Sequence, residues 1–151
     1  MNERSVPATA SFRRRLRSRI SDFDALVQAL TAWGMEAGVP RATLGSVVLI
    51  LDELFANIVA HGYRNAPDGE VEVRACVADG AIQVSLTDQA PAFDLLRAPE
   101  PDTTLSIEER RIGGLGLLFV RRTADSLSWG LPDPARPGVG NMVRFSKKLH
   151  E

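Results

Sequence analysis

The stretch LILDELFANIV, residues 49–59, sets a carboxylate and an amide into an otherwise apolar helix pattern. Glu53 and Asn57 are four residues apart, so they lie on one helix face, one turn from each other. Their preceding neighbours on that face are Leu49 and Ile50, and burying an unpaired charge there is costly. Two interpretations stay open. Either the helix is wide and its Glu53 edge meets solvent, or Glu53 is a carboxylate base beside an amide that orders a metal ion.

The predicted helix around this stretch begins near Pro40, which suits a first turn, and runs to His61, with Gly62 as its C-terminal cap. An earlier helix follows Ser21 and Asp22, which offer caps, and repeats apolar residues at helical spacing. Those apolar residues are Phe23, Leu26, Val27, Leu30 and Trp33. A third helix is predicted over residues 113–125, after a cluster of glycines.

Strands are predicted before and after these helices in the sequence. They span residues 9–19, 71–77, 82–86, 127–129 and 142–149. The apolar residues of the first segment would also suit one face of a helix, but we favour a strand whose arginines share one face. That arginine face is either solvated or a surface for a partner or a dimer. Asp79-Gly80 predicts a hairpin turn. The order indicates an α+β fold, a two-layer sandwich in which three helices cover a mixed, mostly antiparallel sheet of about five strands.

Two further places break the apolar pattern. Asp88 continues the phase of Ile82, Val84 and Leu86, so an inward carboxylate there could accept a hydrogen bond from a ligand's amino group. Alternatively the strand stops at Leu86 and Asp88 begins a turn. RIGGLGL, residues 111–117, opens a helix after a long irregular segment, so its free amides could bind phosphate, or the glycines could be a hinge. It matches neither the P-loop nor the Rossmann pattern.

Composition narrows the function classes. A chain of 151 residues fits one domain, residues 1–151, of which 1–7 are expected to be disordered. The net charge of -1 gives no argument for direct binding of nucleic acid. No apolar stretch approaches the roughly 20 residues of a membrane span, and no signal pattern opens the chain, so we expect no membrane contact. The single Cys76 fits a reducing cytoplasm, and the two histidines and Cys76 lack metal-ligand spacing.

The order and combination of these motifs resemble the Bergerat-fold ATPases of gyrase, histidine kinases and mismatch-repair proteins, and among them the anti-sigma-factor serine kinases. DELFANIVAHGY, residues 52–63, looks like the N-box of that branch. DQAPAFD, residues 88–94, looks like its first glycine box, and GGLGL, residues 113–117, like its second. The resemblance includes the closing GNMVRF, residues 140–145, and covers the chain from about residue 8 to 149.

This resemblance implies a role for each motif residue. Glu53 would accept the proton of the attacking hydroxyl, Asn57 would coordinate Mg²⁺, and Asp88 would receive the adenine amino group. The other residues expected to bind the cofactor ATP are Ala92, Gly113, Gly114, Leu115, Gly116 and Leu117. Residues 89–112 would form the ATP lid. One departure is visible: the first box usually reads Asp-x-Gly with a second glycine, whereas this chain has Ala90 and Ala92.

The function that the resemblance implies is an ATP-dependent protein serine/threonine kinase that acts as a cytoplasmic anti-sigma factor. Its substrate would be a STAS-type anti-anti-sigma protein, its other partner a sigma factor, and its own state a homodimer. The alternative is a non-catalytic adaptor with a degenerate ATP pocket, motivated by Ala90 and Ala92. A detached histidine-kinase ATPase domain is disfavoured, because no dimerisation helix pair carries a phosphoacceptor histidine.

Overall fold

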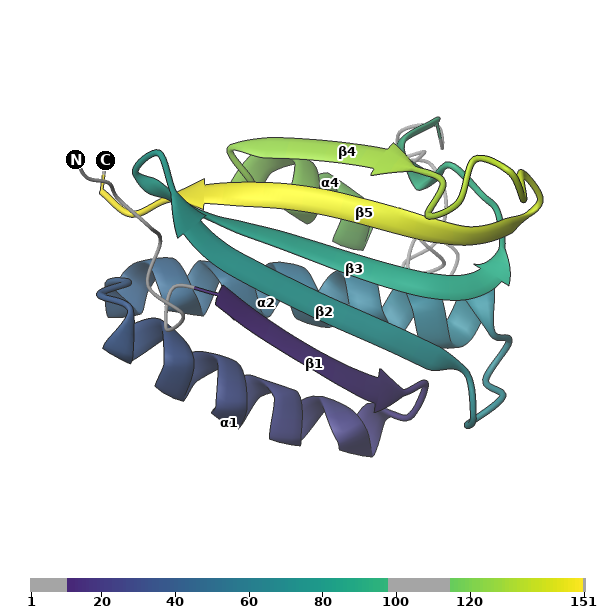
Figure 1. Ribbon diagram of the computed structural model, residues 1–151, viewed down its shortest axis with the longest axis horizontal. Coiled ribbons are helices and arrows are strands. Elements are labelled where there is room, and N and C mark those ends of the chain that lie inside the picture. Colours follow the sequence, from purple (N-terminus) through teal and green to yellow (C-terminus); the bar gives the residue numbers. More distant parts are fainter. Residues whose placement is uncertain (1–10, 98–114, 151) are drawn as a thin grey trace.

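The computed structural model describes residues 11–97 and 115–150 (Figure 1). The elements in chain order are β1 (Ser11–Arg17), α1 (Ile20–Glu36), α2 (Arg41–Asn57), the π-helical turn η2 (Ile58–Gly62), β2 (Glu70–Ala78), β3 (Ala81–Pro91), the 3-10 turn η3 (Leu95–Arg97), α4 (Leu115–Thr123), β4 (Ser126–Gly130) and β5 (Val139–Lys148). The predicted order of strand, two helices, hairpin, helix and two strands is confirmed.

The strands form one five-stranded sheet in the order β1-β2-β3-β5-β4. The predicted α+β sandwich is confirmed. All four pairings between the described strands are antiparallel, whereas the prediction allowed a mixed, mostly antiparallel sheet. The hairpin between β2 and β3 turns at Asp79 and Gly80, whose φ angles are 55° and 73°. These left-handed angles are what an Asp-Gly turn requires.

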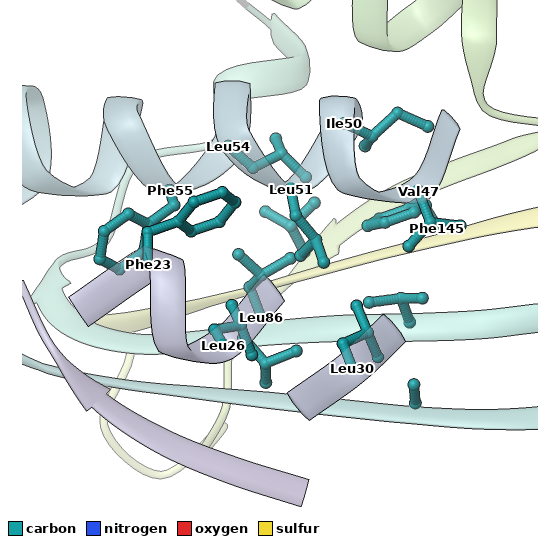
Figure 2. Close-up of a cluster of buried hydrophobic side chains, with 14 of the residues drawn as sticks. Phe23, Leu26, Leu30, Val47, Ile50, Leu51, Leu54, Phe55, Leu86 and Phe145 are labelled. Atoms are coloured by element: carbon teal, nitrogen blue, oxygen red, sulfur yellow. The ribbon is translucent and has the colours of Figure 1, made fainter. Parts of the chain in front are cut away.

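Side chains alternate between the two faces of each strand, and only one face carries the helices (Figure 1). On that face the strand residues pack with the apolar sides of α1 and α2, as Figure 2 shows. The largest fully buried side chains include Leu26, Leu30, Ile50, Leu51, Leu54, Phe55, Leu86 and Phe145. Phe23 of α1 stacks on Phe55 of α2 at a centroid distance of 5.4 Å, which fixes the two helices against each other.

The helix that begins at Arg41 continues without a break through η2 to Gly62, 22 residues in all. By length and composition it could cross a membrane, which corrects the sequence-based expectation that no stretch comes close. Half of its most apolar window is buried within the fold, as in the core helix of a two-layer sandwich. The predicted cap at Gly62 is also corrected, because Gly62 ends a π turn in which Tyr63 N–H donates to the Ile58 carbonyl at 2.9 Å.

Two other boundaries differ from the sequence pattern. Asp22 does not cap α1: its Oδ2 accepts the backbone N–H of Arg17 at 2.9 Å, and the helix begins at Ile20. The strand β3 continues to Pro91, three residues into the predicted lid of residues 89–112. The rest of that lid from residue 98 onward lies outside the described residues.

Candidate functional site

Asp88 lies on the helix-facing side of β3, close to the strand's end. It keeps the phase of Leu86 and pairs in register with Val71 on one side and Asn141 on the other. Its side chain is only 3% exposed. The predicted inward orientation is therefore confirmed, and the alternative that the strand stops at Leu86 is wrong, because β3 continues to Pro91.

The hydrogen bonds that the described residues make to the Asp88 carboxylate both end on Oδ1. The donors are the Ala90 N–H at 2.9 Å and Nδ2 of Asn141 at 3.0 Å. Burial raises the pKa of the Asp88 carboxyl above its ordinary 3.8, while the bonds from Asn141 and Ala90 act in the lowering direction. The second oxygen is the one that can receive a donor from a ligand.

Asn141 of β5 connects four groups around this carboxylate. Its Nδ2 donates to Asp88 and to the Pro91 carbonyl, the latter at 3.2 Å. Its Oδ1 accepts the Phe93 N–H and the indole N–H of Trp129, each at 2.8 Å. Both amide donors and both acceptor sites are thus occupied, and the side chain is 8% exposed. Asn141 therefore fixes the orientation of the aspartate and the start of the segment beyond β3.

The sequence-based assignment of site residues did not include Asn141. The signal was present, because Asn141 shares the strand phase of Val143 and Phe145, both of which are buried. A polar side chain at a core-facing strand position is the pattern that identified Asp88. Applied to the last strand, the same reasoning would have found its partner.

Tyr63 connects the end of the long helix to the sheet beside Asp88. Its hydroxyl donates to the Glu70 carbonyl and accepts the Gln89 N–H, both at 2.7 Å. Burial is the largest cause of the raised pKa of this phenol, and the negative charge of Asp88 acts in the same direction. This residue fixes the position of the π turn relative to β2 and β3.

Ala90, the first departure from the family's glycine pattern, adopts ordinary strand geometry. It is not among the described residues with positive φ, so the alanine is not strained there. Its side chain is 2% exposed, and its methyl carbon lies 3.1 Å from the place where a Cβ on Gly62 would stand. The methyl group that Ala90 adds to the box is thus accommodated by the absence of a side chain at Gly62, at the end of the long helix.

Glu53, on α2, meets the first turn of α4. A Cβ added to Gly116 would come within 3.0 Å of the Glu53 Cδ, and closer still to Oε2. Because Gly116 has no side chain, the carboxylate lies close to this backbone, and a side chain at 116 would displace it. Glu53 is half-buried, between exposed Leu49 and buried Ile50. The half-exposed position of Glu53 fits the interpretation in which its edge of the helix meets solvent, and its role as a base stays a prediction.

Asn57 follows Glu53 by one turn and is also half-buried, at the point where the regular helix gives way to the π turn. Single π turns within helices occur often at functional sites. The described residues contain no group of three His, Cys, Asp or Glu side chains that could hold a metal ion. An Mg²⁺ ion at Asn57 would therefore need oxygens from its ligand, as in phosphate-bound magnesium sites.

The remaining predicted cofactor residues are only partly described. Gly113 and Gly114 lie outside the described residues, and Leu115 is the first residue of α4. Leu117 is buried at 5% exposure, and Ala92 is half-buried, with its N–H donating to the Gly138 carbonyl at 3.1 Å. Gly116, which the structure describes, lies against another predicted site residue, Glu53.

The site therefore lies between one face of the sheet and one face of the long helix. Glu53, Asn57 and Gly62 follow one another along that helix, and Gly62 contacts Ala90, two residues from Asp88. At a rise of 1.5 Å per residue, Glu53 and Gly62 are roughly 13 Å apart along the axis. A half-buried carboxylate and an amide at one end and a buried carboxylate at the other suit a long, polar ligand.

Comparison with known proteins identifies relatives of this arrangement. The family model described as a histidine kinase-like ATPase domain matches residues 16–147. The serine-protein kinase RsbW of Listeria monocytogenes serovar 1/2a is 25% identical over 103 residues, covering 66% of this chain and 66% of that protein. The anti-sigma F factor of Clostridium botulinum strain Eklund 17B is 26% identical over 108 residues, covering 71% and 72%. With the RsbW proteins, the chain thus spans just under two thirds of the relatives' length.

Solved structures show the same fold. The RsbU and RsbW domains of Rv1364c from Mycobacterium tuberculosis match with a TM-score of 0.62 at 18% identity, over 91% of this chain and 32% of that one. The SiaB–SiaC complex from Pseudomonas aeruginosa matches with a TM-score of 0.62 at 16% identity, over 89% of each chain. The resemblance predicted from the sequence motifs is confirmed by these relatives.

Proposed function

The chain belongs to the histidine kinase-like ATPase domain family, and we propose that it is a protein serine/threonine kinase that transfers the terminal phosphoryl group of ATP to a small regulatory partner. The observation that carries the proposal is the arrangement of Glu53 and Asn57 along one helix that ends against the strand of Asp88. Each of these residues supplies a different part of the required chemistry.

Asp88 would recognise the adenine ring. An exocyclic amino group is a hydrogen-bond donor, and it would meet the carboxylate oxygen that the strands leave to a ligand. Asn141 supports this role, because its amide holds Oδ1 and thereby sets the direction of the other oxygen. A guanine ring presents a carbonyl at the corresponding position, so the carboxylate would select adenine over guanine.

Glu53 and Asn57 would act at the phosphate end. Bound Mg²⁺ would neutralise phosphate charge, with the amide oxygen of Asn57 as a protein ligand. The start of α4 lies beside Glu53, and the free amides of a helix N-terminus attract anions. The lid over the triphosphate would then come from the part of residues 89–112 that follows β3.

The reaction follows from these positions. The Glu53 carboxylate accepts the proton of the partner's serine or threonine hydroxyl, whose oxygen attacks the γ-phosphorus. The bond from that phosphorus to the bridging oxygen of ADP breaks, and ADP leaves with the electron pair. Since this transfer depends mainly on positioning and charge, α2 contributes by holding Glu53 and Asn57 one turn apart.

The partner we propose is a STAS-type anti-anti-sigma protein, and a sigma factor is the second partner of a homodimeric, cytoplasmic regulator. The names of relatives support this assignment, since they include a serine-protein kinase and an anti-sigma F factor. The fold similarity to a chain of the SiaB–SiaC complex supports binding to a protein partner.

Incubation of the chain with labelled ATP, Mg²⁺ and a panel of STAS proteins tests the proposal. We expect label on one of them, and none with Glu53→Gln. Absence of transfer to every candidate, with wild type and Glu53→Gln indistinguishable, would overturn the kinase assignment.

The packing of Ala90 supports one alternative function, a non-catalytic adaptor. A methyl group stands where the family has a glycine, two residues from Asp88, where it would narrow the space left for adenine. Calorimetry with Mg-ATP separates the two functions. Binding that is lost in Asp88→Asn supports the kinase, and no binding by the wild-type chain supports the adaptor.

A further inference from the structure

The face of the sheet that the helices leave uncovered carries a row of arginines. Cross-strand pairing aligns five residues from the five strands: Arg13, Arg74, Ser85, Arg144 and Ser128, in the order of the sheet. All three arginines are exposed. They line a hollow of about 730 Å³, and none of the residues that line it is acidic. We call this hollow the arginine trough.

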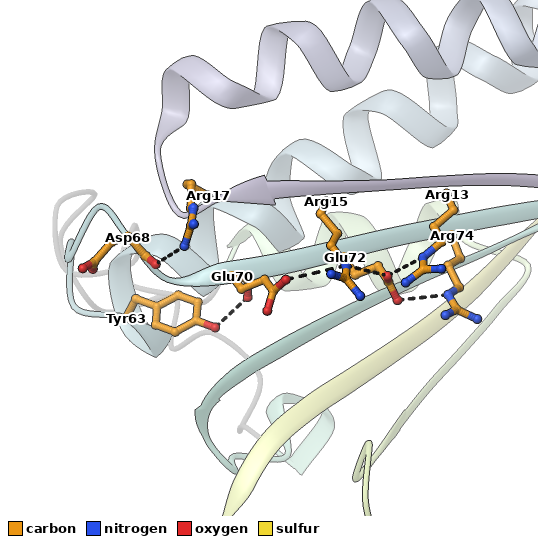
Figure 3. A network of polar contacts seen from close by, with 8 residues as sticks. All are labelled: Arg13, Arg15, Arg17, Tyr63, Asp68, Glu70, Glu72 and Arg74. Atoms are coloured by element: carbon orange, nitrogen blue, oxygen red, sulfur yellow. Dashed lines mark hydrogen bonds and ion pairs between the residues drawn. The ribbon is translucent and has the colours of Figure 1, made fainter.

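The charges around the trough are only partly balanced. Glu72 faces three guanidinium groups, with its carboxylate oxygens 2.6 Å from Nε of Arg13, 3.0 Å from Nε of Arg74 and 3.3 Å from Nε of Arg15 (Figure 3). Burial would raise the pKa of the Glu72 carboxyl, but the hydrogen bonds from these arginines outweigh it and the pKa is lowered. Arg144 has no ion-pair partner among the described residues.

Like charges directly opposite each other on neighbouring strands are destabilising, and Arg13 faces Arg74. Glu70 also pairs with Arg15, at 3.6 Å, so Glu70 and Glu72 together face Arg13, Arg15 and Arg74, and Arg144 is unpaired among the described residues, which leaves an excess of positive charge. Serine hydroxyls at Ser85 and Ser128 flank Arg144 and add neutral donors. From this charge and donor pattern we propose that the arginine trough binds an extended acidic segment of a partner protein.

The dimensions suit such a segment. Neighbouring strands are roughly 4.8 Å apart, so Arg13 and Arg144, three strand spacings from each other, are separated by about 14 Å. An extended peptide rises about 3.3 Å per residue, so five or six residues span the row. Alternate side chains of that peptide point the same way, about 6.6 Å apart, so acidic groups at i, i+2 and i+4 cover about the same length as the row of arginines.

Two other occupants fit the trough less well. A nucleic acid strand needs exposed aromatic rings for stacking, but the phenylalanines of the lining are half-buried Phe12 and fully buried Phe145. A second copy of the chain packed face to face would bring two rows of arginines together, and the neighbouring carboxylates of Glu70 and Glu72 are already paired with arginines of their own sheet. The acidic segment is the occupant whose charge complements the surface.

Fluorescence anisotropy with labelled deca-L-glutamate tests the proposal on the full chain. We expect the double variant Arg74→Ser/Arg144→Ser to weaken binding at least tenfold. The matched variants Arg41→Ser and Arg136→Ser, which change exposed arginines outside the trough lining, should weaken it less than twofold. Equal losses in the trough and control variants would overturn the proposal, because they would show charge attraction without a site.

Glu72→Gln keeps the proposal testable even if the double variant does not fold. Removing the competing carboxylate should tighten deca-glutamate binding about threefold or more, and weakened or unchanged binding would contradict the proposal. Tighter binding of a decathymidylate that depends on the same arginines would assign the trough to nucleic acid instead. Self-association that Arg74→Ser/Arg144→Ser abolishes, seen by analytical ultracentrifugation, would assign it to a second copy.

Discussion

The two ends of the candidate site differ in how their polar side chains are held. At the Asp88 end, Asn141 and Tyr63 connect the residues around the carboxylate through bonds to three strands and the loop beyond β3. At the Glu53 end, the arrangement depends on helix phase and on the approach of α4 at Gly116. The first end resembles a pre-organised recognition pocket, and the second suits groups that take part in chemistry.

This difference teaches where substitutions should separate stability from activity. Removing one member of a buried polar network destabilises the folded state, because the other members are left without hydrogen-bond partners. A half-buried carboxylate that lies against a glycine leaves few groups without a partner when it is removed. Changes near Glu53 should therefore affect turnover, and changes near Asn141 should affect the fold as well.

The largest effect is expected at Glu53. Glu53→Gln should lower the rate of phosphoryl transfer by about 10²- to 10⁴-fold, the usual contribution of a general base. The affinity for Mg-ATP should stay within about threefold, since the proton acceptor is not a recognition group. Single-turnover kinetics and calorimetry measure the two quantities. Asp52→Asn, which removes the exposed neighbouring carboxylate, is the matched control and should leave both unchanged.

Asp88→Asn should weaken ATP binding by about 10- to 100-fold, because a charge-assisted hydrogen bond to the adenine amino group is lost. Calorimetry against ATP and GTP measures the effect, and discrimination between the two should fall with it. Asp79→Asn, at an exposed hairpin turn that also tolerates asparagine, is the control. If Asp88→Asn binds ATP as well as the wild type, the recognition end lies elsewhere.

Asn141→Ala sharpens the contrast between the ends. It leaves the Trp129 indole N–H, the Phe93 N–H and one bond of Asp88 without their partner, so the free energy of unfolding should fall by about 2–3 kcal/mol. Urea unfolding measures the loss. Met142→Ala, on the opposite face of the same strand, should cost less, and equal losses would show that Asn141 does not organise this end.

The pH dependence gives a smaller effect of known sign. Because the pKa of Asp88 is raised above 3.8, its carboxylate protonates at a higher pH than an ordinary aspartate, and ATP affinity should fall as the pH drops through that raised value. Protonation favours the folded state, so the stability contribution of this group is present below pH 3.8 and is lost as the pH rises through the folded pKa. Both dependences should vanish in Asp88→Asn. A midpoint at or below 3.8 for ATP binding would contradict the assignment.

The smallest effect is expected at Ala90. Since this residue has ordinary strand geometry, Ala90→Gly should destabilise the chain by no more than about 1 kcal/mol. ATP affinity should change less than threefold if the methyl group does not obstruct adenine. Strong ATP binding that appears only in Ala90→Gly would show that the natural alanine blocks the pocket, as the adaptor hypothesis requires.

The sequence predicted the fold because its signals were local. Strand alternation, helical spacing and the Asp79-Gly80 turn each depend on neighbours in the chain. The inward side chain of Asp88 followed from the same alternation. The contact of Glu53 with Gly116 and the four bonds of Asn141 join segments that are far apart in the sequence, and no local period shows which segments meet.

The π turn at the end of the long helix was also beyond the sequence pattern. Gly62 looked like a helix cap, since glycine is common there. Instead its missing side chain makes room for the methyl group of Ala90, a contact between two positions 28 residues apart. The departure from the usual glycine pattern at Ala90 could be interpreted only after this packing was known.

A crystal structure with a non-hydrolysable ATP analogue and Mg²⁺ tests most directly whether both ends serve a single nucleotide. We predict the adenine amino group within hydrogen-bond distance of the Asp88 carboxylate and the terminal phosphate beside Asn57 and Glu53. A nucleotide that touches only one of these ends, or that lies on the other face of the sheet, would contradict the account.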